Sequence, residues 1–157
     1  MLEIENLQSK HRGGPGFIIG AGPSLHFQDL SWLKDKTVIA VNSGIVKSPW
    51  ASHFLTDDQG VRNWSYWHDE VKNSNCIKLL YEEKLADVAS QFPEDKVVLF
   101  KHKWWFTPPD KYNLPDGLVL TREADKPIIG ARTSMGSAVH FAYIMGCDPI
   151  VLLGCDC

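Results

Sequence analysis

Short, continuous apolar runs recur along the chain. A run of this kind suits a strand whose two faces are both covered, as in the parallel sheets of α/β proteins. We therefore predict strands at residues 17–20, 37–42, 53–56, 76–80, 96–100 and 150–153.

Between most of these runs, apolar residues follow the spacing of a helix. Ser24 is a favourable N-cap for a helix through about Leu33, and Asp57 with Asp58 lies at the start of the next one. The residues expected on the buried faces of the later helices are Val61, Trp64, Trp67 or His68, Val71, Leu85, Val88, Ala89, Phe92, Met135, Ala138, Val139 and Ala142. The alternation predicts an α/β, Rossmann-like fold: a doubly wound, mostly parallel sheet with helices on both faces.

Residues 101–127 break the alternation. They contain Trp104, Trp105, Phe106 and several prolines, and we predict an irregular insertion there, since loops of this length usually serve a function. Residues 1–13 are expected to form a polar lead-in and residues 14–157 a single domain. The chain ends soon after its last apolar run, which predicts either a truncated chain or a function confined to the residues upstream.

Length and charge narrow the class of protein. The chain has 157 residues, enough for one domain with a real core, and a net charge of −3. It lacks the dense basic run of a nucleic-acid binder and any apolar stretch of membrane-spanning length. The N-terminus is polar, so we predict a cytoplasmic protein. The four cysteines fit neither a disulfide framework nor a zinc knuckle.

The first predicted strand ends in a glycine turn, Gly20-Ala21-Gly22-Pro23-Ser24. Small residues and free amide groups at the start of a helix favour a bound phosphate. The turn differs from a dinucleotide fingerprint, because Leu25 replaces the third glycine and Asn42, not an acid, ends the second strand. This argues against a pyridine-nucleotide oxidoreductase. The alternative is a tight strand–helix turn without a ligand.

A second candidate phosphate site lies near the other end of the chain. Thr133, Ser134 and Gly136 begin a predicted helix, and Arg132 beside them has the geometry to neutralise a diphosphate. An ordinary N-cap beside a surface arginine is the alternative. Asn42 has the chemistry to bind a base or a ribose, or it is simply a turn residue.

Acidic residues at predicted strand ends suggest a metal. Asp57 and Asp156 have the chemistry to hold Mg²⁺ on a diphosphate, although capping of a helix is the common role of an aspartate such as Asp57. No tightly bound cofactor is predicted. Among the histidines, His53 and His102 are the best placed for acid–base work, but neither has a partner visible in the sequence, so the catalytic base stays unknown.

These segments resemble a known family. His11-Arg12-Gly13, the run from Gly16 to Leu25, the run from Val38 to Asn42, and the end of the chain from Thr133 to Asp156 resemble the archaeal 6-hydroxymethylpterin diphosphokinase-like family, also called domain of unknown function 115. The order of elements is also similar to the family 42 bacterial sialyltransferases. Ala21 stands where their turn has an asparagine, and their catalytic residues follow the last strand present here.

The resemblance implies two uses of one site. By analogy with the sialyltransferases, Gly22, Ser24, Asn42, Thr133 and Ser134 would hold the nucleotide of an activated sugar. By analogy with the diphosphokinase, the same edge of the sheet would hold a nucleoside triphosphate with Mg²⁺ near Asp57 or Asp156.

We therefore expect a nucleotide-binding transferase, most simply a glycosyltransferase-like protein with a small-molecule or glycan acceptor under the insertion. The alternatives are a Mg²⁺-dependent diphosphokinase with a pterin-like acceptor, and a non-catalytic or degenerate nucleotide-binding module. The tryptophans of the insertion suit an acceptor or the contact surface of an oligomer equally well.

Overall fold

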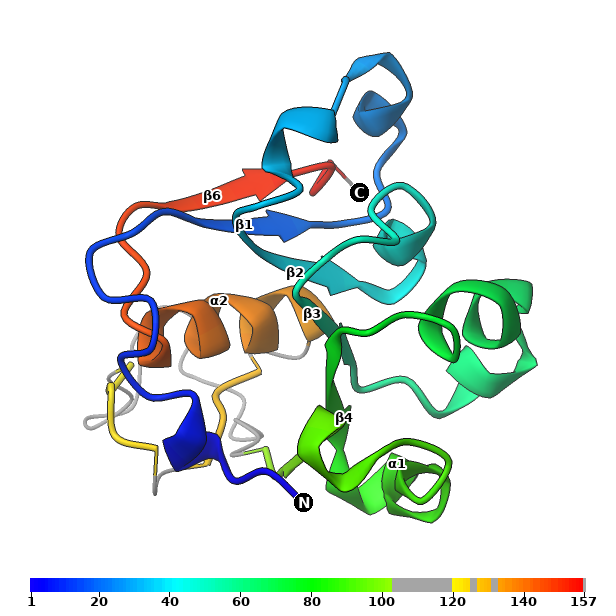
Figure 1. Cartoon of the computed structure of the whole chain (residues 1–157), viewed down its shortest axis with the longest axis vertical. Helices are drawn as coiled ribbons and strands as arrows, with labels where there is room; N and C mark the ends of the chain where they lie inside the picture. Colours follow the sequence, from blue (N-terminus) through cyan, green and yellow to red (C-terminus); the bar gives the residue numbers. More distant parts are fainter. Residues whose placement is uncertain (103–119, 125–126, 131–132, 157) are drawn as a thin grey trace, which may run out of the picture.

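Six parallel strands form one open sheet in the computed structural model, which describes residues 1–102, 120–124, 127–130 and 133–156 (Figure 1). The strand order is β5-β4-β3-β2-β1-β6. The strands are β1 (Gly16–Ile19), β2 (Thr37–Val41), β3 (His53–Thr56), β4 (Ile77–Tyr81), β5 (Val97–Phe100) and β6 (Ile150–Leu153). Each predicted strand is present within a residue of its predicted bounds, because continuous apolar runs suit strands buried on both faces.

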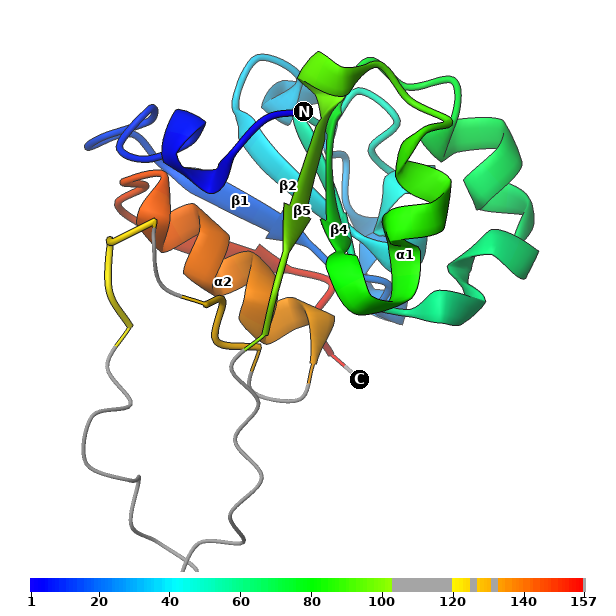
Figure 2. The same ribbon diagram turned by 90° about the horizontal axis from the view of Figure 1, so that it is seen from below.

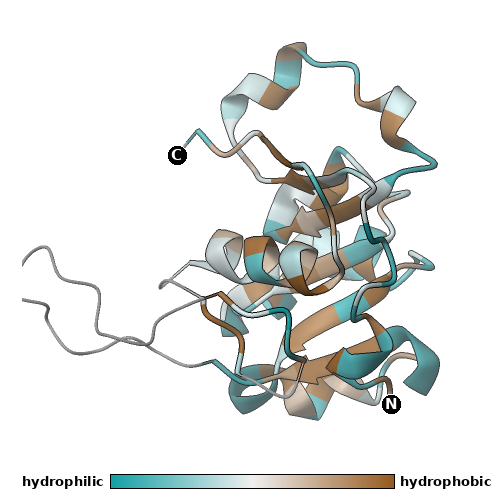
Figure 3. Cartoon of the chain, turned by 90° about the vertical axis from the view of Figure 1, so that its left-hand side faces the viewer, coloured by the Kyte–Doolittle hydropathy of each residue, from teal (hydrophilic) through white to brown (hydrophobic). Residues whose placement is uncertain are grey.

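Apolar side chains form a separate core cluster on each face of the sheet. Helix α2 (Ser134–Ile144) covers one face, where Phe141 packs in the same cluster as Ile18 and Ile39. Helix α1 (Glu82–Ala89) covers the other face with Leu85. The two helices lie on opposite sides of the strands (Figure 2), and hydrophobic residues concentrate along the strands between them (Figure 3). The Rossmann-like α/β prediction is confirmed.

The order of the strands reverses at β1. The chain adds β2 to β5 outward on one side of β1, then returns through α2 and places β6 on the other side. In open α/β sheets, ligands bind beyond the carboxyl ends of the strands, beside such a reversal. The carboxyl ends of β1 and its neighbours are therefore the first place to look for a site.

The predicted polar lead-in packs against the sheet. It contains a 3₁₀ helix, η1 (Ile4–Asn6), and Leu7 is completely buried in the cluster beneath α2. The amide of Ser9 donates to the carbonyl of Ile144 at 2.9 Å, and the amide of His11 donates to Met145 at 2.8 Å. These bonds satisfy carbonyls that the end of α2 would otherwise leave open.

The predicted helix from Ser24 to Leu33 is wrong. Two 3₁₀ helices replace it, η2 (Pro23–Phe27) and η3 (Ser31–Leu33), and the N-cap is Gly22 rather than Ser24. Pro23 is suited to the first helical position, so the N-cap lies at Gly22, two residues before the predicted one. Gln28 ends the first helix with an extended backbone, and the carboxylate of Asp29 accepts from the amide of Ser31 at 2.9 Å, at the start of the second.

The segment after Asp57 differs from a single amphipathic helix. Asp58 caps a 3₁₀ helix, η5 (Gln59–Asn63), by accepting from the amide of Gly60 at 2.8 Å, and a π-helix, η6 (Trp67–Val71), follows. Trp64, between them, has an extended backbone, so its side chain leaves the predicted face and is 59% exposed. The other short helices are η4 (Asn42–Val46) and η7 (Glu94–Lys96).

Two further expectations concern the rest of the chain. Most of the predicted insertion at 101–127 lies outside the described residues; at its ends, His102 and Ile128 form a parallel bridge. In the part of the chain that the structure describes, no helix combines the length and apolarity needed to cross a bilayer.

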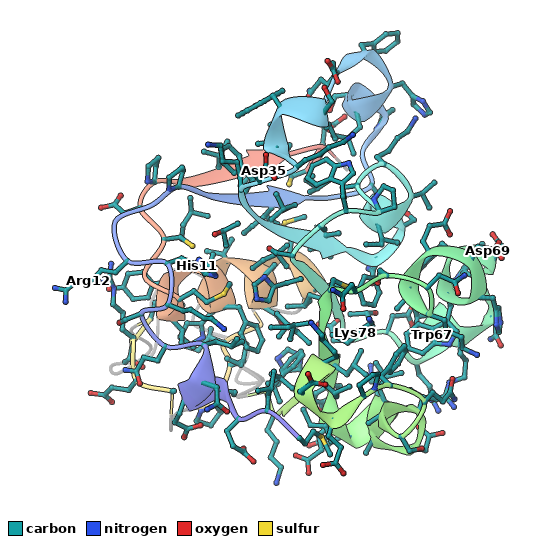
Figure 4. All side chains as sticks on the ribbon, viewed as in Figure 1. His11, Arg12, Asp35, Trp67, Asp69 and Lys78 are labelled. Carbon is teal, nitrogen blue, oxygen red and sulfur yellow. The ribbon has the colours of Figure 1, made fainter. Side chains whose placement is uncertain are left out.

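His53 is at the opposite edge of the sheet from the candidate site. It begins β3, is only 2% exposed, and its Nδ1 lies 2.9 Å from the hydroxyl of Ser52. The ring of His11, which lies on the N-terminal segment beside the end of α2 (Figure 4), approaches it edge-on at 6.1 Å. Burial, followed by the charges of His11 and Lys10, lowers the pKa of His53 to about 3.

This burial predicts acid sensitivity. The folded protein keeps His53 neutral, whereas the unfolded chain binds a proton below about pH 6.5, so stability falls from pH 6.5 toward pH 3. The group contributes a slope of up to about 1.4 kcal/mol per pH unit in that range. Urea unfolding at a series of pH values should show a shallower slope in His53→Gln than in the unchanged protein.

The exposed His68 offers the matched control: His68→Gln makes the same substitution at the surface, and the slope in His53→Gln should be shallower than in His68→Gln. The pKa values of His11 and His140 are also lowered by burial, so part of the slope should persist in His53→Gln. An identical slope in His53→Gln and the unchanged protein would contradict the assignment.

Candidate functional site

A cavity of about 220 Å³ lies beyond the carboxyl ends of β1 and β2. Three groups of residues line it: the glycine turn after β1, the middle of η2, and η4 with the residue that follows it. They are Gly20, Ala21, Gly22, Leu25, His26, Ser43, Val46 and Lys47. The structure thus brings the predicted Gly20 and Gly22 to the expected edge. It also adds two basic residues, His26 and Lys47, that the sequence analysis did not single out.

The glycines of this turn are required by packing within the protein. A Cβ on Gly20 would collide with the carbonyl oxygen of Gly154, and one on Gly22 would meet the carboxylate of Asp156. The amide of Gly22 donates to the carbonyl of Gly154 at 2.7 Å. The turn is therefore seated against the segment that follows β6, and its shape depends on that segment.

A carboxylate of the chain occupies the anion position of the glycine turn. Asp156 accepts from the amide of Ser24 at 3.1 Å and from its hydroxyl at 2.5 Å. These bonds, the one from the hydroxyl first, lower the pKa of Asp156. The amide and hydroxyl of Ser24, which the sequence analysis assigned to a phosphate, thus bind a carboxylate of the chain instead.

The second predicted phosphate site has the same arrangement. Thr133 is the N-cap of α2 and accepts from the amide of Gly136 at 3.0 Å, while the hydroxyl of Ser134 donates to the carboxylate of Asp57. Asp57 therefore lies where an anion would bind at the start of α2. Arg132 lies outside the described residues.

Asp57 also pairs with His102. Its Oδ2 lies 3.3 Å from Nε2 of His102, whose side chain is fully buried beside the rings of Tyr81 and Phe100. Burial raises the pKa of Asp57, but the hydrogen bonds of His102 and Ser134 and the charge of His102 outweigh it, so the net shift is downward. Asp57 is an ionised carboxylate held between an imidazole and a hydroxyl.

The sequence alone could not pair these residues. Asp57 follows β3 and His102 follows β5, and only the parallel order of the sheet brings both to its carboxyl edge. Among the described residues, no group of three or more His, Cys, Asp or Glu side chains is arranged to hold a metal ion. Asp57 and Asp156 are therefore separate carboxylates, each with internal hydrogen-bond donors.

Asn42 carries local strain beside the cavity. It has a φ of 50°, which non-glycine residues rarely adopt, at the point where β2 ends. Its buried Oδ1 has no hydrogen-bond partner among the described residues. Strain and an unmatched buried acceptor at a strand end are common features of binding sites, so Asn42 remains a candidate ligand contact.

Comparisons with known proteins add no assignment: no family model matches the chain, and neither a curated protein nor a solved structure matches it. The resemblance to the diphosphokinase-like and sialyltransferase families stays a prediction.

The packing of the glycine turn predicts the effect of Gly20→Ala. The added methyl group would force the turn away from Gly154, and overpacking of this kind costs about 1–3 kcal/mol. Chemical denaturation should measure this loss in the free energy of unfolding.

Gly14→Ala is the matched control. A Cβ at Gly14 would meet only the carbonyl of His11 at 3.5 Å, an ordinary contact, so its stability should be unchanged or slightly higher. Equal stability of the two variants would contradict the tight seating of the turn.

Proposed function

We propose that this chain is a nucleotide-binding transferase, glycosyltransferase-like, which takes a nucleotide-activated sugar as donor and a small molecule or glycan as acceptor. The observation that carries the proposal is the cavity at the carboxyl edge, beside the reversal in strand order, with an ionised aspartate on the same edge. The donor would therefore bind beyond β1 and β2, and proton transfer would take place at Asp57, which follows the neighbouring strand β3.

Asp57 supplies the base that glycosyl transfer needs. Transfer requires removal of a proton from the acceptor hydroxyl, and Asp57 already accepts a hydrogen bond from a hydroxyl, that of Ser134. Nε2 of His102 lies 3.3 Å from the other carboxylate oxygen, close enough for its charge to act on Asp57. An acceptor hydroxyl that replaced Ser134 would meet an aligned and ionised carboxylate.

The non-catalytic module is the second candidate, and one observation favours it. Both predicted phosphate positions already hold carboxylates of the chain, Asp156 at the glycine turn and Asp57 at the start of α2. A Mg²⁺-dependent diphosphokinase would instead require Asp57 or Asp156 to exchange these contacts for a metal. The three functions differ in the ligands that they bind and in whether product forms.

Thermal shift separates these candidates. The protein is heated with CMP, CDP, CTP, UDP, GDP or ATP, each with Mg²⁺ and with EDTA. A ligand at about 100 times its Kd adds about 2.7 kcal/mol, which raises the melting temperature measurably. We expect a shift with a nucleoside mono- or diphosphate that persists in EDTA. A shift only with a triphosphate and Mg²⁺ would favour the diphosphokinase, and no shift with any nucleotide would overturn the proposal.

The role of Asp57 has its own test. Asp57→Asn keeps the shape of the side chain but removes the charge, so release of nucleotide from a panel of CMP-, UDP- and GDP-sugars with acceptors should fall by about 10²–10⁴-fold. The nucleotide-induced thermal shift should remain.

Asp58→Asn is the neighbouring control, because asparagine caps a helix as well as aspartate does, and its rate should match the unchanged protein. Equal rates for Asp57→Asn and Asp58→Asn would exclude Asp57 as the base. Nucleotide binding without turnover in any variant would favour the non-catalytic module.

A further inference from the structure

A second cavity adjoins the first. It has a volume of about 250 Å³ and shares Leu25, His26 and Lys47 with the cavity at the carboxyl edge. The walls of both come from the two connections that lead from β1 to β2 and from β2 to β3. The shared residues place the two cavities side by side, with His26 and Lys47 at the junction between them, and we refer to the pair of cavities as the groove.

The size of the groove fits a nucleotide better than either cavity does. Binding sites for small molecules usually have volumes of about 300–1,000 Å³, and each cavity alone is below that range. The second cavity also contains Trp50, a half-buried aromatic residue whose ring offers a face for a heterocycle. The first cavity ends at the glycine turn, on the edge where Asp57 lies.

The junction carries the ammonium group of Lys47 and the imidazole ring of His26. His26 and Lys47 are exposed, and within the described part of the chain neither side chain takes part in a hydrogen bond or an ion pair. Lys34 adds a further positive charge to the second cavity, and the acid there, Asp29, accepts from the amide of Ser31. An unpaired ammonium group on a concave surface attracts an anion, and the N–H of an imidazole ring is able to donate a hydrogen bond to it.

The amides that the sequence analysis assigned to phosphate are already occupied. Asp156 holds the amide of Ser24, and the side chain of Thr133 holds the amide of Gly136. A phosphate in the groove therefore needs counter-charges from elsewhere, and the junction supplies them.

We infer that Lys47 and His26 form the phosphate subsite of the nucleotide groove. The diphosphate lies at the junction, the nucleoside extends into the second cavity against Trp50, and the activated group extends over the glycine turn toward the carboxyl edge. This inference rests on the proposed function and says how the phosphates are held: by the ammonium group of Lys47 and a hydrogen bond from His26, without a metal held by Asp57 or Asp156.

Titration calorimetry in EDTA tests the subsite, with the nucleoside diphosphate that gives the largest thermal shift, its nucleoside, and inorganic pyrophosphate as ligands. Lys47→Gln should weaken the diphosphate and pyrophosphate at least 10-fold and leave the nucleoside unchanged. His26→Gln should act in the same direction. Trp50→Leu should weaken the nucleotide and the nucleoside but not pyrophosphate.

Lys36→Gln is the matched control, because Lys36 is an exposed lysine that lines neither cavity, and all its affinities should equal those of the unchanged protein. Lys47 is also exposed, so the melting temperature of Lys47→Gln without ligand should not change.

The two proposals fail in different ways. If nucleotides bind but Lys47→Gln and Lys36→Gln have the same affinities, the subsite is wrong while the proposed function stands. If pyrophosphate binds in a Lys47-dependent manner but no nucleotide does, the junction is an anion site and the nucleotide function is wrong. Binding of diphosphate only with Mg²⁺ would overturn the metal-independent subsite.

Discussion

The pairing of β6 with β1 is the interaction on which the carboxyl edge depends. It joins two strands from opposite ends of the chain and brings residues 154–156 against residues 20–24. The backbone bond from Gly22 to Gly154 and the carboxylate of Asp156 then fix the course of the turn after β1. The first wall of the cavity is consequently shaped by a segment that lies far away in the sequence.

Internal carboxylates are the second organising feature. At the start of η2 and of α2 the chain presents groups that favour negative charge, and in each case an aspartate from another strand end supplies it. The two aspartates differ in environment: Asp156 is exposed, whereas Asp57 lies against the buried His102. Asp156 holds the turn after β1, and Asp57 lies between the imidazole of His102 and the hydroxyl of Ser134.

Much of the fold could be predicted, because apolar runs report directly on strands buried on both faces. The helices were less predictable. The spacing of apolar residues does not distinguish an α-helix from the two 3₁₀ helices, η2 and η3, that lie between β1 and β2. Trp64 was mispredicted for a similar reason. Its backbone is extended directly after η5, and its side chain therefore faces the solvent and not the core.

The site was predicted only in part. Glycines at a strand end indicate the edge of the sheet at which the cavity lies, and Gly20 and Gly22 line that cavity. The pairing of Asp57 with His102 depends on strand order, which no local pattern contains. Lys47 and His26 look like ordinary surface residues in the sequence, and only the meeting of two connections gives them a common position.

The position of β6 also has a consequence for how the protein reaches its folded state. Strands β1 to β5 pair with neighbours that are close in the chain, whereas β6 must close a loop of more than a hundred residues before it gains any contact with β1. Closing such a loop costs entropy before contacts repay it, so pairings of this kind form late. The glycine turn therefore acquires its final shape only when the end of the chain has docked, and a nascent chain still lacking residues 150–156 has an unfinished groove. The shape of the cavity at the carboxyl edge is in this way set by one of the latest pairings in the sheet.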